Sequence, residues 1–127
     1  MDQKGLIRAV AERTGLSREE SADISRAVLE GLADQLSDGE ARRLAADLPD
    51  LEEQLQARRR RRPEAHPVKL QDFIKQVSER TAMTDEDTRA GAGAVFAVLR
   101  EALSEEEYRH VTGQLPAEYI ALAQTAG

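Results

Sequence analysis

The chain has 127 residues, and its 18 basic and 24 acidic side chains give a formal net charge of −6. The absence of cysteine excludes disulfides, thiolate metal sites and cysteine nucleophiles. The length is close to that of one domain, and we find neither a signal peptide nor an apolar run long enough to span a bilayer. We therefore expect one cytoplasmic domain over residues 1–127.

The main organising feature of the sequence is a tandem duplication. Residues 6–49 return without a gap as residues 73–116. Identical aligned pairs include Val10 and Val77, Ser37 and Ser104, Glu40 and Glu107, Leu48 and Leu115. Self-similarity of this kind defines the unit that folds. We divide the chain into a first repeat at residues 1–57, a basic and proline-containing linker at residues 58–67, and a second repeat at residues 68–127.

The first predicted helix covers residues 3–14. Leu6, Ile7 and Val10 lie on one face of this segment, and Gly15 is a plausible left-handed stop. Ser17, followed by Glu20, has the spacing of a capping box and predicts the start of a second helix. The second copy has Thr84 followed by the shorter Asp87, so its reciprocal bond is less certain.

The second predicted helix has an apolar stripe at three- and four-residue spacing. In the first copy the stripe consists of Ile24, Ala27, Val28, Gly31, Leu32 and Leu36, and in the second of Gly91, Ala94, Val95, Val98, Leu99 and Leu103. Gly91 and Gly93 replace the larger Ile24 and Arg26, which predicts that another helix approaches closely there. A nucleotide loop is the weaker interpretation, because a third glycine is absent and the segment falls inside a helix.

A second capping box starts the third predicted helix of each repeat. It pairs Ser37 with Glu40 in the first copy and Ser104 with Glu107 in the second. Pro49 and its copy Pro116 end that helix and can begin a short fourth one. The sequence thus predicts an all-α protein, a single bundle of about eight helices. We expect its two repeats to be related by a pseudo-two-fold axis.

This combination of features resembles a bacterial family catalogued as domain of unknown function 2267. The family's Gln-Leu-Pro signature occurs as Gln114, Leu115 and Pro116, whereas the first copy departs from it with Asp47 before Leu48 and Pro49. The resemblance covers nearly the whole chain. It implies the fold and supplies no catalytic residues.

A partial similarity connects the first third of the chain to the histone-like HU proteins. It rests on LIRAVAE at residues 6–12, GLS at 15–17 and AVLE at 27–30, which resemble the N-terminal helical hairpin of that family. In HU proteins the hairpin forms much of the dimer body, and later strands and arms hold DNA. This chain continues into further helices instead, so no DNA-contacting residue can be transferred.

The candidate binding site is a run of five arginines, Arg58, Arg59, Arg60, Arg61 and Arg62. Five guanidinium groups cannot lie unpaired in a core, so they face water, an acidic surface or a polyanion. The run could dock on the protein's own carboxylates as an exposed helix end. It could bind a phosphate backbone with strongly salt-dependent affinity, assisted by Arg42 and Arg43. An acidic partner protein or a membrane surface is the third alternative.

The remaining polar residues indicate no chemistry. His66 lies in the linker and His110 on a polar helical face, where a solvated histidine is the more common role. Carboxylates at residues 85–87 and 105–107 fall in first helical turns, where the helix dipole favours negative charge. No phosphate loop, nucleophile elbow or zinc-protease motif is present. We expect no catalytic residue, cofactor or metal.

The leading functional prediction is a non-enzymatic helical interaction module that binds a partner protein. The alternative is a nucleic-acid-associated protein that uses the basic junction between the repeats. Either function is compatible with a monomer or a homodimer.

Overall fold

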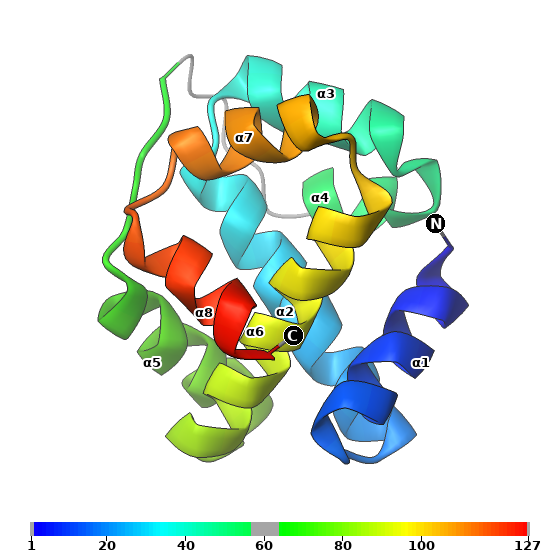
Figure 1. Ribbon diagram of the computed structural model, residues 1–127. Helices are drawn as coiled ribbons and strands as arrows, with labels where there is room; N and C mark the ends of the chain where they lie inside the picture. Colours follow the sequence, from blue (N-terminus) through cyan, green and yellow to red (C-terminus); the bar gives the residue numbers. More distant parts are fainter. Residues whose placement is uncertain (1, 57–63, 127) are drawn as a thin grey trace.

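The computed structural model describes residues 2–56 and 64–126, and within these ranges the protein is all-α without strands (Figure 1). The first half contains α1 (Gln3–Thr14), α2 (Arg18–Gln35), α3 (Asp38–Asp47), the 3₁₀ turn η1 (Pro49–Leu51) and α4 (Glu52–Gln56). The second half contains α5 (Leu70–Thr81), α6 (Asp85–Ala102), α7 (Glu105–Gly113) and α8 (Glu118–Ala126). None of the helices in the described ranges combines the length and apolarity needed to cross a membrane.

The first helix of each half ends on a residue in the left-handed conformation. Gly15 follows α1 with φ 76°, as the sequence predicts. Ala82, its aligned counterpart after α5, has φ 57°. Glycine adopts this conformation without steric cost, whereas the alanine Cβ makes it unfavourable. The two helix ends thus share a geometry but differ in how well the residue suits it.

Capping at the start of α2 follows the prediction. The Glu20 amide donates to Ser17 Oγ at 3.0 Å, and the Ser17 amide donates back to Glu20 Oε1 at 3.0 Å. Hydrogen bonds from the backbone and side chain of Ser17 lower the pKa of Glu20. At α6 the Thr84 hydroxyl accepts from the Asp87 amide at 3.1 Å. Local sequence is therefore sufficient to place the starts of these two helices.

The capping box predicted for α3 is only half correct. Ser37 Oγ accepts from the Glu40 amide at 3.2 Å, so the helix starts where expected. The Ser37 amide, however, donates to Gln114 Oε1 of the second half at 3.0 Å rather than to Glu40. Ser104 likewise accepts from the Glu107 amide at 3.0 Å. Both Glu40 and Glu107 have buried side chains, which a surface cap would not require.

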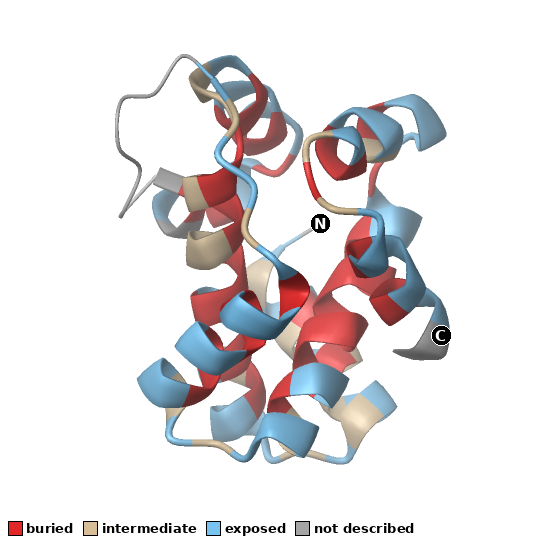
Figure 2. Ribbon diagram, turned by 90° about the vertical axis from the view of Figure 1, so that its left-hand side faces the viewer, coloured by how far each residue is buried: buried red, intermediate tan, exposed pale blue. Residues whose placement is uncertain are grey.

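The two long helices α2 and α6 cross at the centre of the molecule, and at least half of the residues of each are buried (Figures 1 and 2). A Cβ placed on Gly91 would lie 2.6 Å from Ile24 Cγ1, so the missing side chain admits Ile24. The prediction that Gly91 permits a close helix approach is therefore confirmed. Gly31 similarly makes room for Phe73, whose Cε1 would lie 2.7 Å from an added Cβ.

Packing between the halves is extensive. Helix α1 packs against both α2 and α6, and α5 packs against both α6 and α2. Helices α3 and α7 contact each other at one end of the bundle (Figure 1). Buried aliphatic residues from both halves form one continuous cluster. The core is therefore shared between segments that are distant in the sequence.

Residues 64–69 are attached to the core through Gln35 and Tyr119, both fully buried. Gln35 accepts from the Val68 amide at 2.8 Å, and the Tyr119 hydroxyl donates to the Val68 carbonyl at 2.6 Å. The two side chains also join each other, with Gln35 Nε2 3.2 Å from the hydroxyl. Burial raises the pKa of Tyr119 to about 12, so it stays a donor at neutral pH.

Candidate functional site

The predicted arginine site, Arg58 to Arg62, falls outside the described residues, so it stays a prediction. Of the two proposed auxiliaries, Arg42 is exposed on α3 and Arg43 points to a hollow between α3 and α7. The described residues contain two other features on which chemistry can act. One is a groove between α7 and α8, and the other is a buried pair of carboxyl groups between α3 and α7.

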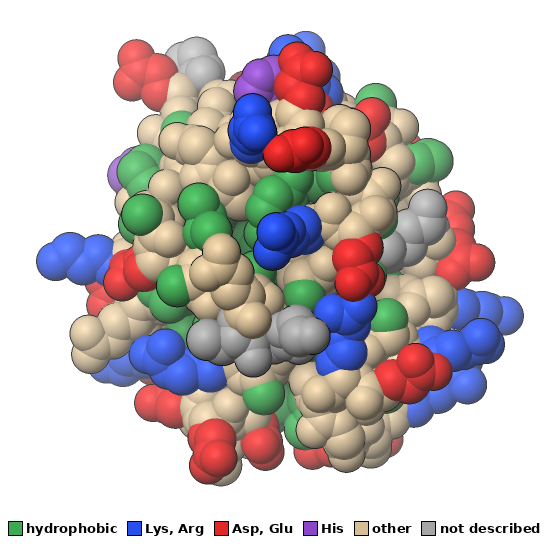
Figure 3. Space-filling model, viewed as in Figure 1, with side chains coloured by type: hydrophobic (Ala, Val, Ile, Leu, Met, Phe, Trp, Pro, Cys, Tyr) green, Lys and Arg blue, Asp and Glu red, His purple; other side chains and the backbone are tan. Residues whose placement is uncertain are grey.

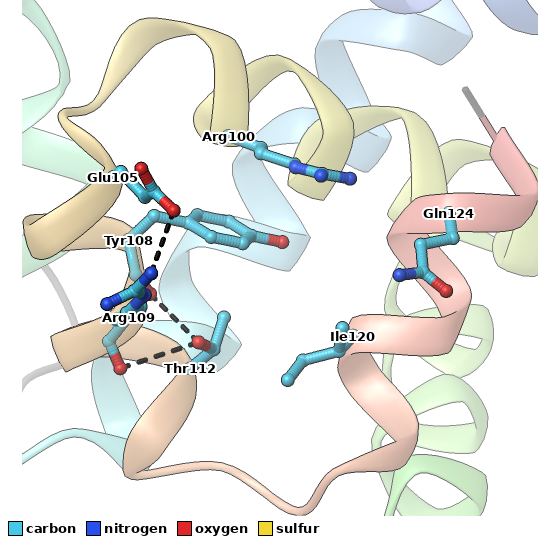
Figure 4. Close-up of a pocket in the computed structure, with 7 residues that line it drawn as sticks. All are labelled: Arg100, Glu105, Tyr108, Arg109, Thr112, Ile120 and Gln124. Atoms are coloured by element: carbon cyan, nitrogen blue, oxygen red, sulfur yellow. Dashed lines mark hydrogen bonds and ion pairs between the residues drawn. The ribbon is translucent and has the colours of Figure 1, made fainter.

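The groove, called here the α7–α8 groove, has a volume of about 360 Å³. Figure 4 shows Tyr108, Arg109 and Thr112 on one side, Ile120 and Gln124 opposite them, and Arg100 at the far end. Ile120 has 40% of its surface exposed and is the most exposed large hydrophobic residue in the described ranges. Hydrophobic side chains gather in the middle of this face, with basic side chains beside them (Figure 3).

The polar groups of the groove are unequally satisfied. Arg109 forms an ion pair with Glu105 at 2.8 Å on the same helix. No ion pair joins Arg100 to any carboxylate in residues 2–56 or 64–126. The Tyr108 hydroxyl is buried without a hydrogen-bond partner in the same ranges. Burial raises the pKa of Tyr108, and the nearby positive charge of Arg100 opposes the rise. Among the described residues, the groove therefore has a cation without an ion pair and, in its wall, a buried hydroxyl without a hydrogen-bond partner.

The first half has smaller side chains at the aligned positions of α3. Ala41 and Ala45 occupy the positions aligned with Tyr108 and Thr112, and both are buried. Helix α4 packs against both α2 and α3, whereas α8 lies mainly against α6. The position aligned with Ile120 is the exposed Glu53. The groove thus results from larger residues on α7 together with a different placement of the following helix.

The carboxyl pair consists of Glu40 on α3 and Glu107 on α7, which are 6% and 7% exposed. Glu40 Oε2 and Glu107 Oε1 are buried atoms without a partner among the described residues. Burial raises the pKa of Glu107 to about 7. The interaction of its carboxyl group with that of Glu40 and the negative charges of Glu40 and Asp47 add to this rise, and the positive charge of Arg43 opposes it.

A hollow of about 320 Å³ adjoins the pair and is lined by Arg43, Asp47, Ser104, Glu106, Glu107 and His110. Arg43 Nη1 lies 3.8 Å from Glu40 Oε1 and 3.2 Å from His110 Nδ1. His110 is exposed, as predicted, and the cationic Arg43 lies beside its Nδ1. Within the described residues, no group of three or more His, Cys, Asp or Glu side chains is placed to hold a metal ion.

Sequence patterns missed both features for identifiable reasons. The spacing of Glu40 and Glu107 from a serine predicts capping residues, because it fits that role. The identity of these two aligned residues was the available signal that they could meet. For the groove, the signal was the replacement of Glu53 by Ile120 and of Ala41 by Tyr108.

A family model described as an uncharacterized conserved protein family, DUF2267, matches residues 3–122. The match covers nearly the whole chain, so the chain belongs to this family, and the resemblance found in the sequence is confirmed. A search of curated proteins gave no match.

Proposed function

We propose that this DUF2267 protein is a non-enzymatic interaction module that binds a partner protein in the α7–α8 groove. The partner contributes a segment in which an acidic side chain lies next to an apolar one. The observation that carries the proposal is the open groove of about 360 Å³ between α7 and α8 in the second half. This volume lies within the range of about 300–1,000 Å³ typical of ligand sites.

The acidic part of the recognition comes from Arg100. Its guanidinium group has no carboxylate partner within the described ranges, and its planar donors suit a carboxylate in two-point contact. The Tyr108 hydroxyl, which lies between Arg100 and Ile120 in Figure 4, can donate to a carbonyl or carboxylate oxygen. Binding would satisfy a buried polar atom that otherwise costs stability.

The apolar part of the recognition comes from Ile120. An exposed isoleucine beside a half-buried tyrosine presents an apolar surface that a partner side chain could cover. Burial of a leucine-sized side chain contributes about 1.5–3 kcal/mol. Charge and apolar contact together favour a mixed acidic and apolar segment over a purely acidic one.

The experiment is a selection of short linear peptides on the immobilised full chain. We expect enrichment of peptides with Asp or Glu next to Leu, Ile, Phe or Met. Arg100→Gln and Ile120→Glu should each weaken the selected peptides by about tenfold or more. Arg89→Gln is the matched control, because Arg89 is an exposed arginine of α6 that does not line the groove. Failure to enrich any peptide, or equal binding by all variants, would overturn the proposal.

A DNA titration tests the alternative function, which is nucleic-acid binding. A labelled DNA duplex is titrated at about 50 mM and about 200 mM salt, with a control chain in which Arg58 to Arg62 are all alanine. Tight binding that falls steeply with salt and disappears in this control would assign function to the arginine run instead. We expect no such binding.

We also propose that the two repeats, residues 1–57 and 68–127, form one pseudo-symmetric domain. The packing of α1 on α6 and of α5 on α2 supports this arrangement. A protease site introduced between residues 58 and 67 tests it. After cleavage, analytical ultracentrifugation should find the halves still associated, whereas two separate folded halves would contradict the proposal.

A further inference from the structure

We infer that Glu40 and Glu107 share one proton and that this proton holds α3 and α7 together as a pH-responsive latch. The inference concerns the interface between α3 and α7 and does not depend on the α7–α8 groove. It starts from two aligned residues on the contacting helices α3 and α7, both buried and each with a buried oxygen that has no partner in the described residues.

The carboxyl pair lacks a hydrogen-bond donor when both groups are ionised. Two ionised carboxylates are acceptors only, so neither can satisfy the other. Glu40 Oε2 and Glu107 Oε1 are both buried oxygens without a hydrogen-bond partner in residues 2–56 and 64–126. One proton between them converts this repulsion into an O–H···O⁻ hydrogen bond, which is shorter and stronger than a neutral one. A single proton therefore satisfies both buried oxygens.

Charged groups on both α3 and α7 surround the carboxyl pair. From α3, Arg43 lies 3.8 Å from Glu40 Oε1, and Asp47 adds negative charge near Glu107. From α7, Glu106 and His110 line the adjoining hollow. Arg100 of α6 lies instead beside Tyr108, in the separate groove. One arginine can balance one carboxylate, and the negative charge of Asp47 disfavours a second ionisation.

The serine hydroxyls nearby do not remove the need for the proton. Ser37 Oγ and Ser104 Oγ accept from the Glu40 and Glu107 amides, respectively. Ser37 Oγ also accepts from Gln114 Nε2 at 3.1 Å. Neither hydroxyl donates to Glu40 Oε2 or Glu107 Oε1, which have no hydrogen-bond partner in residues 2–56 and 64–126.

The direction of the pH effect follows from Glu107. Its pKa rises from 4.5 to about 7 in the folded protein, so the folded state keeps a proton that the unfolded chain has already released. The stabilisation is complete below about pH 4.5 and is lost as the pH rises towards and through about 7. Above neutrality the paired carboxylates repel, and the contact between α3 and α7 loosens. Any effect of this loosening on the groove, whose wall α7 forms, rests on the proposed function.

The experiment compares thermal unfolding midpoints of wild type, Glu107→Gln and Glu40→Gln from about pH 5 to about pH 8. A glutamine amide donates permanently to the remaining carboxylate, so either variant replaces the shared proton. We expect the wild-type midpoint to fall by about 5 °C more than that of either variant over this range. Glu106→Gln, an exposed neighbour on α7, should behave as wild type.

A direct titration keeps the inference testable if a variant folds poorly. Side-chain carboxyl NMR of the wild type should show one glutamate, lost in the Glu107→Gln or Glu40→Gln spectrum, that releases its proton near pH 7. Parallel midpoint curves, or the absence of any glutamate titrating near neutrality, would overturn the shared proton. No ligand is present in either measurement, so failure here is distinct from failure of the proposed groove function.

Discussion

The region around α3 and α4 and the region around α7 and α8 begin with the same serine-capped helix and end in different surfaces. In the first, Ala41 and Ala45 are buried and α4 covers α3. In the second, Tyr108 and Thr112 take these positions, and α8 lies on α6 beside an open groove. The first region therefore serves as an internal reference, because it has small, buried side chains at the aligned positions of the same helix.

The largest expected effect comes from a substitution at the central helix crossing, where the two halves differ at aligned positions. Gly91→Leu should destabilise the protein by about 3 kcal/mol or more, because even a Cβ would lie 2.6 Å from Ile24 Cγ1. Denaturant unfolding measures the change. Gly39→Leu on α3 is the control, since nothing lies within 4 Å of a Cβ at Gly39. Equal stability of the two variants would remove the role assigned to Gly91.

A smaller effect separates stability from binding in the groove. Tyr108→Phe removes the buried hydroxyl that lacks a partner and should raise the free energy of unfolding by about 1 kcal/mol. The same change should weaken selected acidic and apolar peptides, because the hydroxyl can no longer donate to them. Unfolding curves and peptide titrations on one sample measure both. If stability fell instead, the hydroxyl would have a partner in the free protein.

The smallest expected effect concerns the ends of α1 and α5. Ala82→Gly should stabilise the protein by about 0.5–1 kcal/mol, because glycine removes the Cβ strain at φ 57°. Gly15→Ala should cost about 1 kcal/mol at φ 76°. Opposite signs in denaturant unfolding are the test. A shared sign would mean that surrounding contacts, rather than backbone conformation, decide both positions.

The sequence was sufficient where the decisive interactions are local. Capping by Ser17 and the stop at Gly15 lie within a few residues of the helix ends they define. The all-α class and the close approach at Gly91 followed from apolar spacing and side-chain size. These features depend on neighbours in the chain or on a stripe that any partner helix would cover.

The same local pattern gives a wrong prediction where a residue distant in the sequence competes for the backbone amide. Glu20 and Glu40 both stand three residues after a serine, but only Glu20 bonds back to the serine amide. Gln114 takes the Ser37 amide, and Glu40 turns towards Glu107. As a result, the pKa values shift in opposite directions. The pKa of Glu20 is lowered, whereas the pKa of Glu107, which interacts with Glu40, is raised. The groove escaped prediction because the placement of α8 depends on tertiary packing.

The attachment of residues 64–69 to Gln35 and Tyr119 has a consequence for synthesis on the ribosome. Gln35 is buried and makes its hydrogen bonds to Val68 and Tyr119, which are translated much later. While only the first half has left the exit tunnel, the Gln35 amide has neither of these partners. The Gln35 side chain forms both hydrogen bonds only after Val68 and Tyr119 have been added to the chain. The buried amide of Gln35 therefore has its hydrogen-bond partners only when both halves of the chain are present.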